Sequence, residues 1–194
     1  MACSTLSTGI QFCLCDKSMG GIAEVYLANR DDVDIDGVDA SIDADGLITD
    51  IPLNPSTASI THYKFFKFQI RKNTGSMTST LNVDENTGSS VSTDLVLDWR
   101  AMDYQKRKAM SAFLQGEFVA IVVDANKNKW FLGLNLAVSA SAGTGETGTT
   151  NTDANHYSIT LNDVSNDWPH QIDPDFDIET ILEPAPAKDP CDKS

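Results

Sequence analysis

Only one stretch of the chain has helical periodicity, and strand patterns flank it on both sides. Asp103 is a good N-cap residue, and Tyr104 to Gln115 after it carries apolar residues at helical spacing up to a stop at Gly116. Strands and helices do not alternate along the chain, which disfavours a doubly wound nucleotide-binding sheet. The sequence therefore predicts a mainly β domain with one flanking α-helix over 103–115.

The section from residue 60 onward has the clearest strand patterns. Three segments, ITHYKFFKFQIRK, SMTSTLNV and VSTDLVLDW, are separated by turns that contain glycine. Antiparallel neighbours joined by short turns form a meander, and we expect a long hairpin over 65–92 to project beyond the domain. After the helix, FVAIVV, WFLGLNLAV and HYSITL predict further strands, and the small polar residues of 139–154 indicate a flexible loop.

The length of 194 residues favours a single domain, because one core of that size needs no additional staple. We assign this β-rich domain to 1–167, with an acidic loop over 31–46. The segment 168–194 is acidic and rich in proline, which predicts an extended tail without a core of its own. Docking of this tail on a neighbouring subunit and free exposure to solvent both remain open.

The strongest compositional feature is the acidic charge. The formal net charge is −14 and the sequence pI is near 4.3, so the chain repels both nucleic-acid phosphates and anionic lipids. No window approaches the roughly 18 apolar residues of a membrane span, and the first residues lack the pattern of a signal peptide. The cysteines form no framework, which predicts free thiols in a reducing cytoplasm; they are Cys3, Cys13, Cys15 and Cys191.

One acidic segment has the spacing of a calcium-binding loop. Carboxylates at Asp32, Asp34, Asp36 and Asp43, with Gly37 between them, fit such a loop because oxygen ligands cluster around a sharp turn. The twelfth position is Asp rather than the bidentate Glu, and the flanks have strand patterns, which excludes an EF-hand. The sequence leaves two interpretations, an irregular Ca²⁺ site without other cofactors and a solvated acidic loop.

Basic and aromatic residues gather in two places. Lys106, Arg107 and Lys108 form one face of the predicted helix, and in so acidic a chain we expect basic faces to complement acidic patches on a neighbouring copy. The second group lies on the strand from residue 60, with Lys64 and Lys67 beside it. The candidate interface residues there are Phe65, Phe66, Phe68, Arg71 and Lys72.

The sequence gives little support for catalysis. The histidines His62, His156 and His170 lie far apart, and no nucleophile signature occurs. Gly143, Gly145 and Gly148 spell GxGxxG, but a strand pattern follows instead of the helix that phosphate binding requires. We therefore predict that the protein is not an enzyme.

The order of these segments resembles a known family. FKFQIRKNTGSMTSTLNVDENTGSSVSTDLVLDW, KRKAMSAFLQGEFVAIVVDANKNKWFLGL and GTGETGTTNTDANHYSITLNDVS are similar to virion tail proteins of crAss-like and related phages. The layout of strands, meander, helix and strands also resembles the tail-tube fold of long-tailed phages, contractile injection systems and type VI secretion tubes. The resemblance covers about residues 60 to 172, and no catalytic site comes with it.

The resemblance implies an antiparallel β-sandwich or barrel whose copies form a ring, typically a hexamer, with a β-lined channel. The expected function is a virion structural protein of the tail tube or hub, assembled in the host bacterial cytoplasm, through which DNA passes without specific binding. The expected partners are further copies and other tail proteins, with no membrane, and the acidic excess is expected to coat the lumen. Two alternatives remain: another connector or ring protein of the virion, and a Ca²⁺-dependent β-sandwich binding module.

Overall fold

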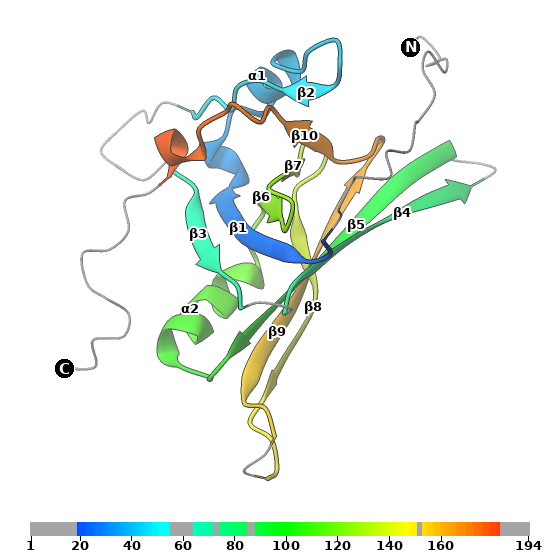
Figure 1. The fold of residues 1–194 in the computed structure, drawn as a ribbon. Coiled ribbons are helices and arrows are strands. Elements are labelled where there is room, and N and C mark those ends of the chain that lie inside the picture. Colours follow the sequence, from blue (N-terminus) through cyan, green and yellow to red (C-terminus); the bar gives the residue numbers. More distant parts are fainter. Residues whose placement is uncertain (1–18, 55–63, 72–73, 85–87, 151–152, 183–194) are drawn as a thin grey trace.

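The computed structural model describes residues 19–54, 64–71, 74–84, 88–150 and 153–182. Within these ranges, ten strands form two sheets, with two α-helices and two 3-10 helices around them (Figure 1). The prediction of a mainly β chain with a flanking helix is confirmed.

The first sheet has six strands in the order β2-β10-β7-β6-β1-β3. β10 pairs in parallel with β2, and the other neighbours are antiparallel. The strands span Ile22–Asn29 (β1), Leu47–Ile48 (β2), Phe66–Gln69 (β3), Phe118–Asp124 (β6), Lys129–Leu132 (β7) and His170–Ile172 (β10).

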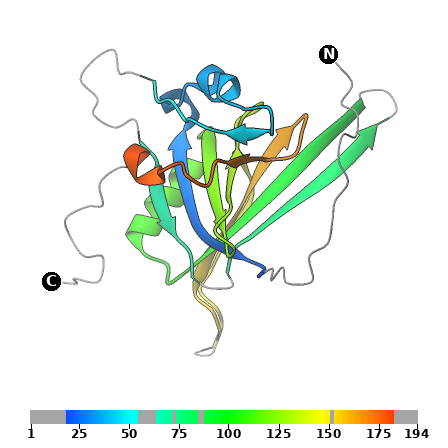
Figure 2. The ribbon, with the colours of Figure 1, turned by 45° about the horizontal axis from the view of Figure 1, so that its top comes forward.

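The second sheet is fully antiparallel and has four strands in the order β4-β5-β9-β8. Its longest strands extend past the rest of the molecule, with β4 and β5 on one side and β8 and β9 on another (Figures 1 and 2). The strands span Ser76–Asp84 (β4), Gly88–Arg100 (β5), Ser139–Glu146 (β8) and His156–Ser165 (β9).

The six-stranded sheet is buried on both faces, which explains why β6 is an uninterrupted apolar run. One face packs against the four-stranded sheet and α2 (Tyr104–Phe113), and residues such as Val122, Leu97 and Phe113 form this core. The other face, with Ile121, is covered by η1 (Arg30–Asp32), α1 (Ile35–Ala40) and η2 (Ile178–Ile181). The chain therefore forms layers on either side of one central sheet.

The helix α2 begins where the sequence predicts. The side chain of Asp103 accepts a hydrogen bond from the backbone N–H of Lys106 at 2.8 Å, which caps the first turn. Just beyond the helix, a Cβ atom at Gly116 would lie 2.1 Å from the ring of Phe118. Glycine is needed there because the next strand returns directly against the end of the helix.

The hairpin differs from the predicted range 65–92. β3 pairs with β1 in the six-stranded sheet, and the antiparallel pair is formed by β4 and β5 instead. The indole of Trp99 holds the two sheets together here, because its Nε1–H donates to the carbonyl of Gln69 at 3.1 Å. The sequence predicted that β3 belongs to the same meander as β4 and β5. In the structure β3 belongs to the other sheet, and Trp99 connects the two sheets at this point.

The segment 139–154 was predicted as a loop, but its first half is the strand β8. Pairing with β9 over the length of the strand overrides the weak strand propensity of its small residues. These residues are also required by packing, because a Cβ atom at Gly145 would lie 2.7 Å from the ring of Tyr157. The next element after these glycines is the strand β9, whereas a phosphate-binding turn of this pattern leads into a helix.

Two further segments are more ordered than predicted. The acidic range 31–46 contains α1, whose Val38 is fully buried in the core. The tail beginning at residue 168 contains β10 and η2, and it buries Ile172, Ile178 and Ile181 in the same cluster. The described part of the tail therefore belongs to the domain, and residues 183–194 lie outside the described ranges.

Candidate assembly surfaces

The outer face of the four-stranded sheet is mainly polar, with Val96 and Val164 as apolar residues among hydroxyl, amide and charged side chains. Strand register places Thr80 beside Ser92 and Thr144 beside Ser158 on this face. The amide of Asn162 donates to Ser92 Oγ at 2.8 Å and to Asp94 Oδ1 at 2.7 Å, which links neighbouring strands. The face is therefore built mainly of hydroxyl and amide side chains held in place by cross-strand bonds.

A cleft of about 490 Å³ lies at one end of this face. Its charged lining consists of Asp98, Arg100 and His156, and Nε2 of His156 lies 3.5 Å from Asp98 Oδ2. Glu146 stands directly opposite His156 on β8. The cleft mixes positive and negative groups, so it offers no concentrated positive charge for a phosphate.

Both edge strands of this sheet are unpaired on their outer sides within the described residues. β4 is nine residues long and β8 eight, and neither contains proline or a basic residue. Natural proteins usually protect such edges with lysine, proline, a covering segment or a very short strand. One bulge between Ala140 and Ala142 is the only irregularity along β8.

Sequence reasoning missed β8 as half of this surface. The available signal was the alternation of small residues in SASAGTGE at hairpin distance before HYSITL, with a glycine and polar turn between them. The turn is ordered by Asp153, whose carboxylate accepts hydrogen bonds from the backbone and hydroxyl of Thr149. These bonds and those from Thr150 lower the pKa of Asp153 to about 2.

The structure separates the residues predicted as one interface. Phe65 is fully buried in the core beneath α1 and η2, whereas Phe68 packs between Trp99 and Phe113 on the opposite face. Phe66 is 42% exposed on the edge strand β3, beside a small apolar cavity of about 160 Å³ that α2 also lines. Arg71 is exposed, and Lys72 lies outside the described residues.

The carboxylates with calcium-loop spacing serve local structure. Asp32 is 8% exposed and accepts a hydrogen bond from Asn29 Nδ2 at 2.8 Å. Asp34 caps α1 by accepting from the N–H of Gly37, and Asp43 accepts from the N–H of Leu47.

Gly37 also has a steric explanation, because a Cβ atom there would lie 2.5 Å from Pro52. Asp36 is exposed in the first turn of α1. In the part of the chain that the structure describes, no three His, Cys, Asp or Glu side chains are grouped so that they could hold a metal ion.

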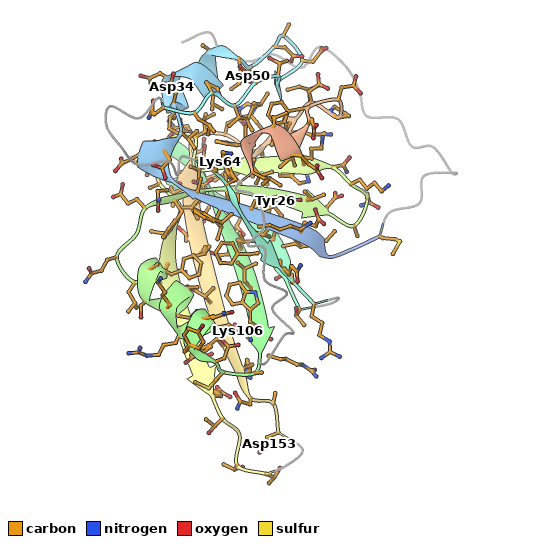
Figure 3. All side chains as sticks on the ribbon, turned by 90° about the vertical axis from the view of Figure 1, so that its left-hand side faces the viewer. Tyr26, Asp34, Asp50, Lys64, Lys106 and Asp153 are labelled. Carbon is orange, nitrogen blue, oxygen red and sulfur yellow. The ribbon has the colours of Figure 1, made fainter. Side chains whose placement is uncertain are left out.

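Charge is distributed unevenly over the molecule. The layer formed by α1, β2, β10 and η2 contains no lysine or arginine between residues 31 and 54 or between 168 and 182. The basic residues of α2 lie toward the other end, and Figure 3 places Lys106 far from Asp34 and Asp50. The exposed carboxylates of this acidic layer are Asp31, Asp36, Asp39, Asp43, Asp45, Asp50, Asp175, Asp177 and Glu179.

This distribution bears on the expected acidic lumen. Most exposed carboxylates lie over the six-stranded sheet, whereas the polar face of the four-stranded sheet carries Asp94, Asp98 and Glu146 among many neutral groups.

None of the described helices is long and apolar enough to cross a membrane. Comparison with models of protein families, with curated proteins and with solved structures finds no match for this chain.

Proposed function

We propose that the protein is a non-enzymatic structural subunit that assembles with copies of itself into a ring, as a tail-tube or tail-hub protein of a phage virion. The observation that carries this proposal is the pair of long edges on the four-stranded sheet, which are unpaired within the described residues and carry no lysine, arginine or proline. An exposed edge presents a row of backbone donors and acceptors and so favours pairing with another chain.

Pairing of β4 on one copy with β8 on the next satisfies both edges. Such a contact uses two different surfaces, so it repeats around an axis and closes into a ring when the rotation between copies allows. The four-stranded sheets then join into one continuous β-lined channel. The family resemblance implies six copies, and a closed ring leaves no sheet edge available for aggregation.

The polar face of the sheet suits the channel wall. Its hydroxyl and amide side chains give DNA phosphates few positive partners, because Arg100 and His156 stand beside Asp98 and Glu146. Tight binding to DNA depends on lysine and arginine contacts to phosphates. DNA therefore passes along such a wall without being held, as ejection through a virion tail requires.

The experiment is negative-stain electron microscopy with light scattering over a concentration series, on the wild type and on an edge variant. The edge variant carries Thr80→Lys on β4 and Thr144→Lys on β8, which places cations at both contact edges. We expect annular particles for the wild type, with the copy number visible in class averages, and monomers for the edge variant.

The matched control carries Ser92→Lys and Ser158→Lys. These residues are the direct cross-strand neighbours of Thr80 and Thr144, on the same face but on the inner strands β5 and β9. We expect the control to form rings, because its lysines do not lie at the contact. Rings in the edge variant, or monomers in the wild type at every concentration, would count against edge-to-edge assembly.

A further inference from the structure

The outward face of α2 has the composition of a protein contact. Tyr104 near its start and Leu114 at its end are 78% and 79% exposed, and Arg107 and Lys108 lie exposed between them. Neither basic side chain makes an ion pair within the described residues, whereas Lys106 is bound to Asp103. Large apolar side chains around free cations are typical of an interface and unusual on a solvated helix.

The chain itself provides a surface of opposite charge. The acidic layer over the six-stranded sheet is rich in exposed carboxylates and has no lysine or arginine of its own in 31–54 or 168–182; Lys129 of β7 reaches it and donates to the carbonyls of Pro174 and Phe176. The layer covers the opposite face of the six-stranded sheet from α2, and the β8–β9 hairpin extends beyond α2 (Figures 1 and 3). Two complementary surfaces on opposite sides of one copy cannot meet within that copy, but they meet when copies are arranged head to tail.

We propose that the outward face of α2 docks on the acidic layer of a second copy, and that this contact stacks one ring on the next. The partner is therefore another copy of this chain, recognised through Asp and Glu side chains. This contact is distinct from the pairing of sheet edges that closes each ring. The inference rests on the proposed function only in taking the stacked units to be rings.

Electrostatics supports this arrangement. Each copy carries a formal charge of −14, so bringing copies together costs repulsive energy unless positive groups lie at the contact. The few free cations of α2 are most effective when they face the densest group of carboxylates. The screening length falls from about 8 Å at physiological salt to about 3 Å at 1 M salt, so the stacking contact weakens with salt. Backbone pairing of strands is much less sensitive to salt.

The test uses charge reversal in the full chain. One variant carries Arg107→Glu and Lys108→Glu on α2, a second carries Asp36→Lys and Asp39→Lys on α1, and a third combines all four substitutions. Asp36 and Asp39 are exposed, and neither side chain caps a helix. Stack length is measured by electron microscopy, and association by light scattering and sedimentation at low and high salt.

Each two-site variant should form unstacked rings, and the concentration at which stacks appear should rise by more than about tenfold, because like charges then meet at the substituted positions. The four-site variant restores opposite charges and should stack again. An equal mixture of the two-site variants should form alternating stacks. Circular dichroism and the presence of rings show that each variant is folded.

Stacking of the two-site variants at wild-type concentrations would overturn the proposal. Failure of both the four-site variant and the mixture to stack would also overturn it, because the loss would then not reflect charge complementarity. A wild type that forms single rings and never associates further would exclude the stacking contact while leaving ring formation intact. Absence of rings with salt-sensitive head-to-tail association would instead exclude the edge contact alone.

Discussion

The indole of Trp99 and the ring of Phe113 lie parallel, with 6.3 Å between their centroids and 3° between their planes. Trp99 is on β5 of the four-stranded sheet and Phe113 is on α2, so the pair fixes the helix against the sheet. Phe68 and Phe118 from the six-stranded sheet complete the cluster, with centroids 5.7 Å and 5.3 Å from that of Phe113. One side chain of the helix thus contacts both sheets.

We expect Phe113→Ala to lower the free energy of unfolding by about 3–5 kcal/mol, the range for truncating a buried aromatic residue. Phe113 is 3% exposed, and its removal leaves a cavity where three elements meet. The neighbouring Leu114 is 79% exposed, so Leu114→Ala should change stability by less than about 0.5 kcal/mol.

Denaturant unfolding of the edge variant Thr80→Lys/Thr144→Lys measures both changes without a contribution from assembly. Equal effects of the two alanine substitutions would show that the aromatic cluster does not stabilise the domain.

The sequence predicted elements whose local pattern and environment agree. β6 is an apolar run because both faces of its sheet are buried, and α2 has a capping aspartate and helical spacing. The predicted strands that became β4, β5 and β9 likewise keep their patterns in the structure. For these segments, local propensity and tertiary packing favour the same structure.

The missed elements depend on contacts outside their own segments. β8 is a strand because it pairs with β9, and the tail is ordered because Ile172 and Ile178 fill a core that includes residues more than a hundred positions earlier, such as Val38 and Ile48. α1 is six residues long, too short for its periodicity to be distinguished from a loop. The residues predicted as one interface lie apart because side chains along this segment alternate between the two faces of the sheet. Phe65 packs in one core and Phe68 in the other.

The buried carboxylate of Asp163 gives a prediction about pH. It is 3% exposed, stands opposite Thr93 across the sheet, and its Oδ1 has no hydrogen-bond partner within the described chain. Burial raises the pKa of Asp163 above its ordinary value, although the N–H of Gly133 and the charge of Arg30 partly oppose this. The folded protein therefore holds the proton more strongly than the unfolded chain does.

Stability should consequently fall as the pH rises from the ordinary pKa of aspartate through the raised pKa of the folded state. Asp163→Asn is neutral and similar in shape, so it should be more stable than the wild type at pH 7. This advantage should shrink toward pH 4. Urea unfolding of both proteins at several pH values measures it. A less stable variant at pH 7 would show that attraction to Arg30 outweighs the cost of burial.

The calcium interpretation predicts stabilisation by the ion, whereas the structure leads us to expect none. Asp32, Asp34 and Asp43 already accept hydrogen bonds from neighbouring groups, and these bonds would have to rearrange around a cation. A ligand that binds only the folded state raises the melting temperature as its concentration exceeds Kd.

We therefore expect equal melting temperatures in millimolar CaCl2 and in EDTA, with MgCl2 as the control for ionic strength. A rise specific to calcium, lost in Asp36→Asn, would restore the binding-module alternative.

Just after β7, Gly133 has a φ of +98°, and a Cβ atom there would lie 2.8 Å from Val119 Cγ1. Arg30 donates to the carbonyl of Gly133 as well, so this turn is held from two sides. Gly88 has a similar φ of +90°, but nothing lies within 4 Å of its Cβ position.

Gly88→Ala should cost roughly 1–2 kcal/mol from backbone strain alone. Gly133→Ala should cost that amount plus roughly 1–3 kcal/mol for displacing packed neighbours. Denaturant unfolding in the monomeric edge variant compares them. If both substitutions lower the free energy of unfolding equally, Val119 moves away from the new methyl group at little cost. The positive φ alone would then explain why glycine is needed at position 133.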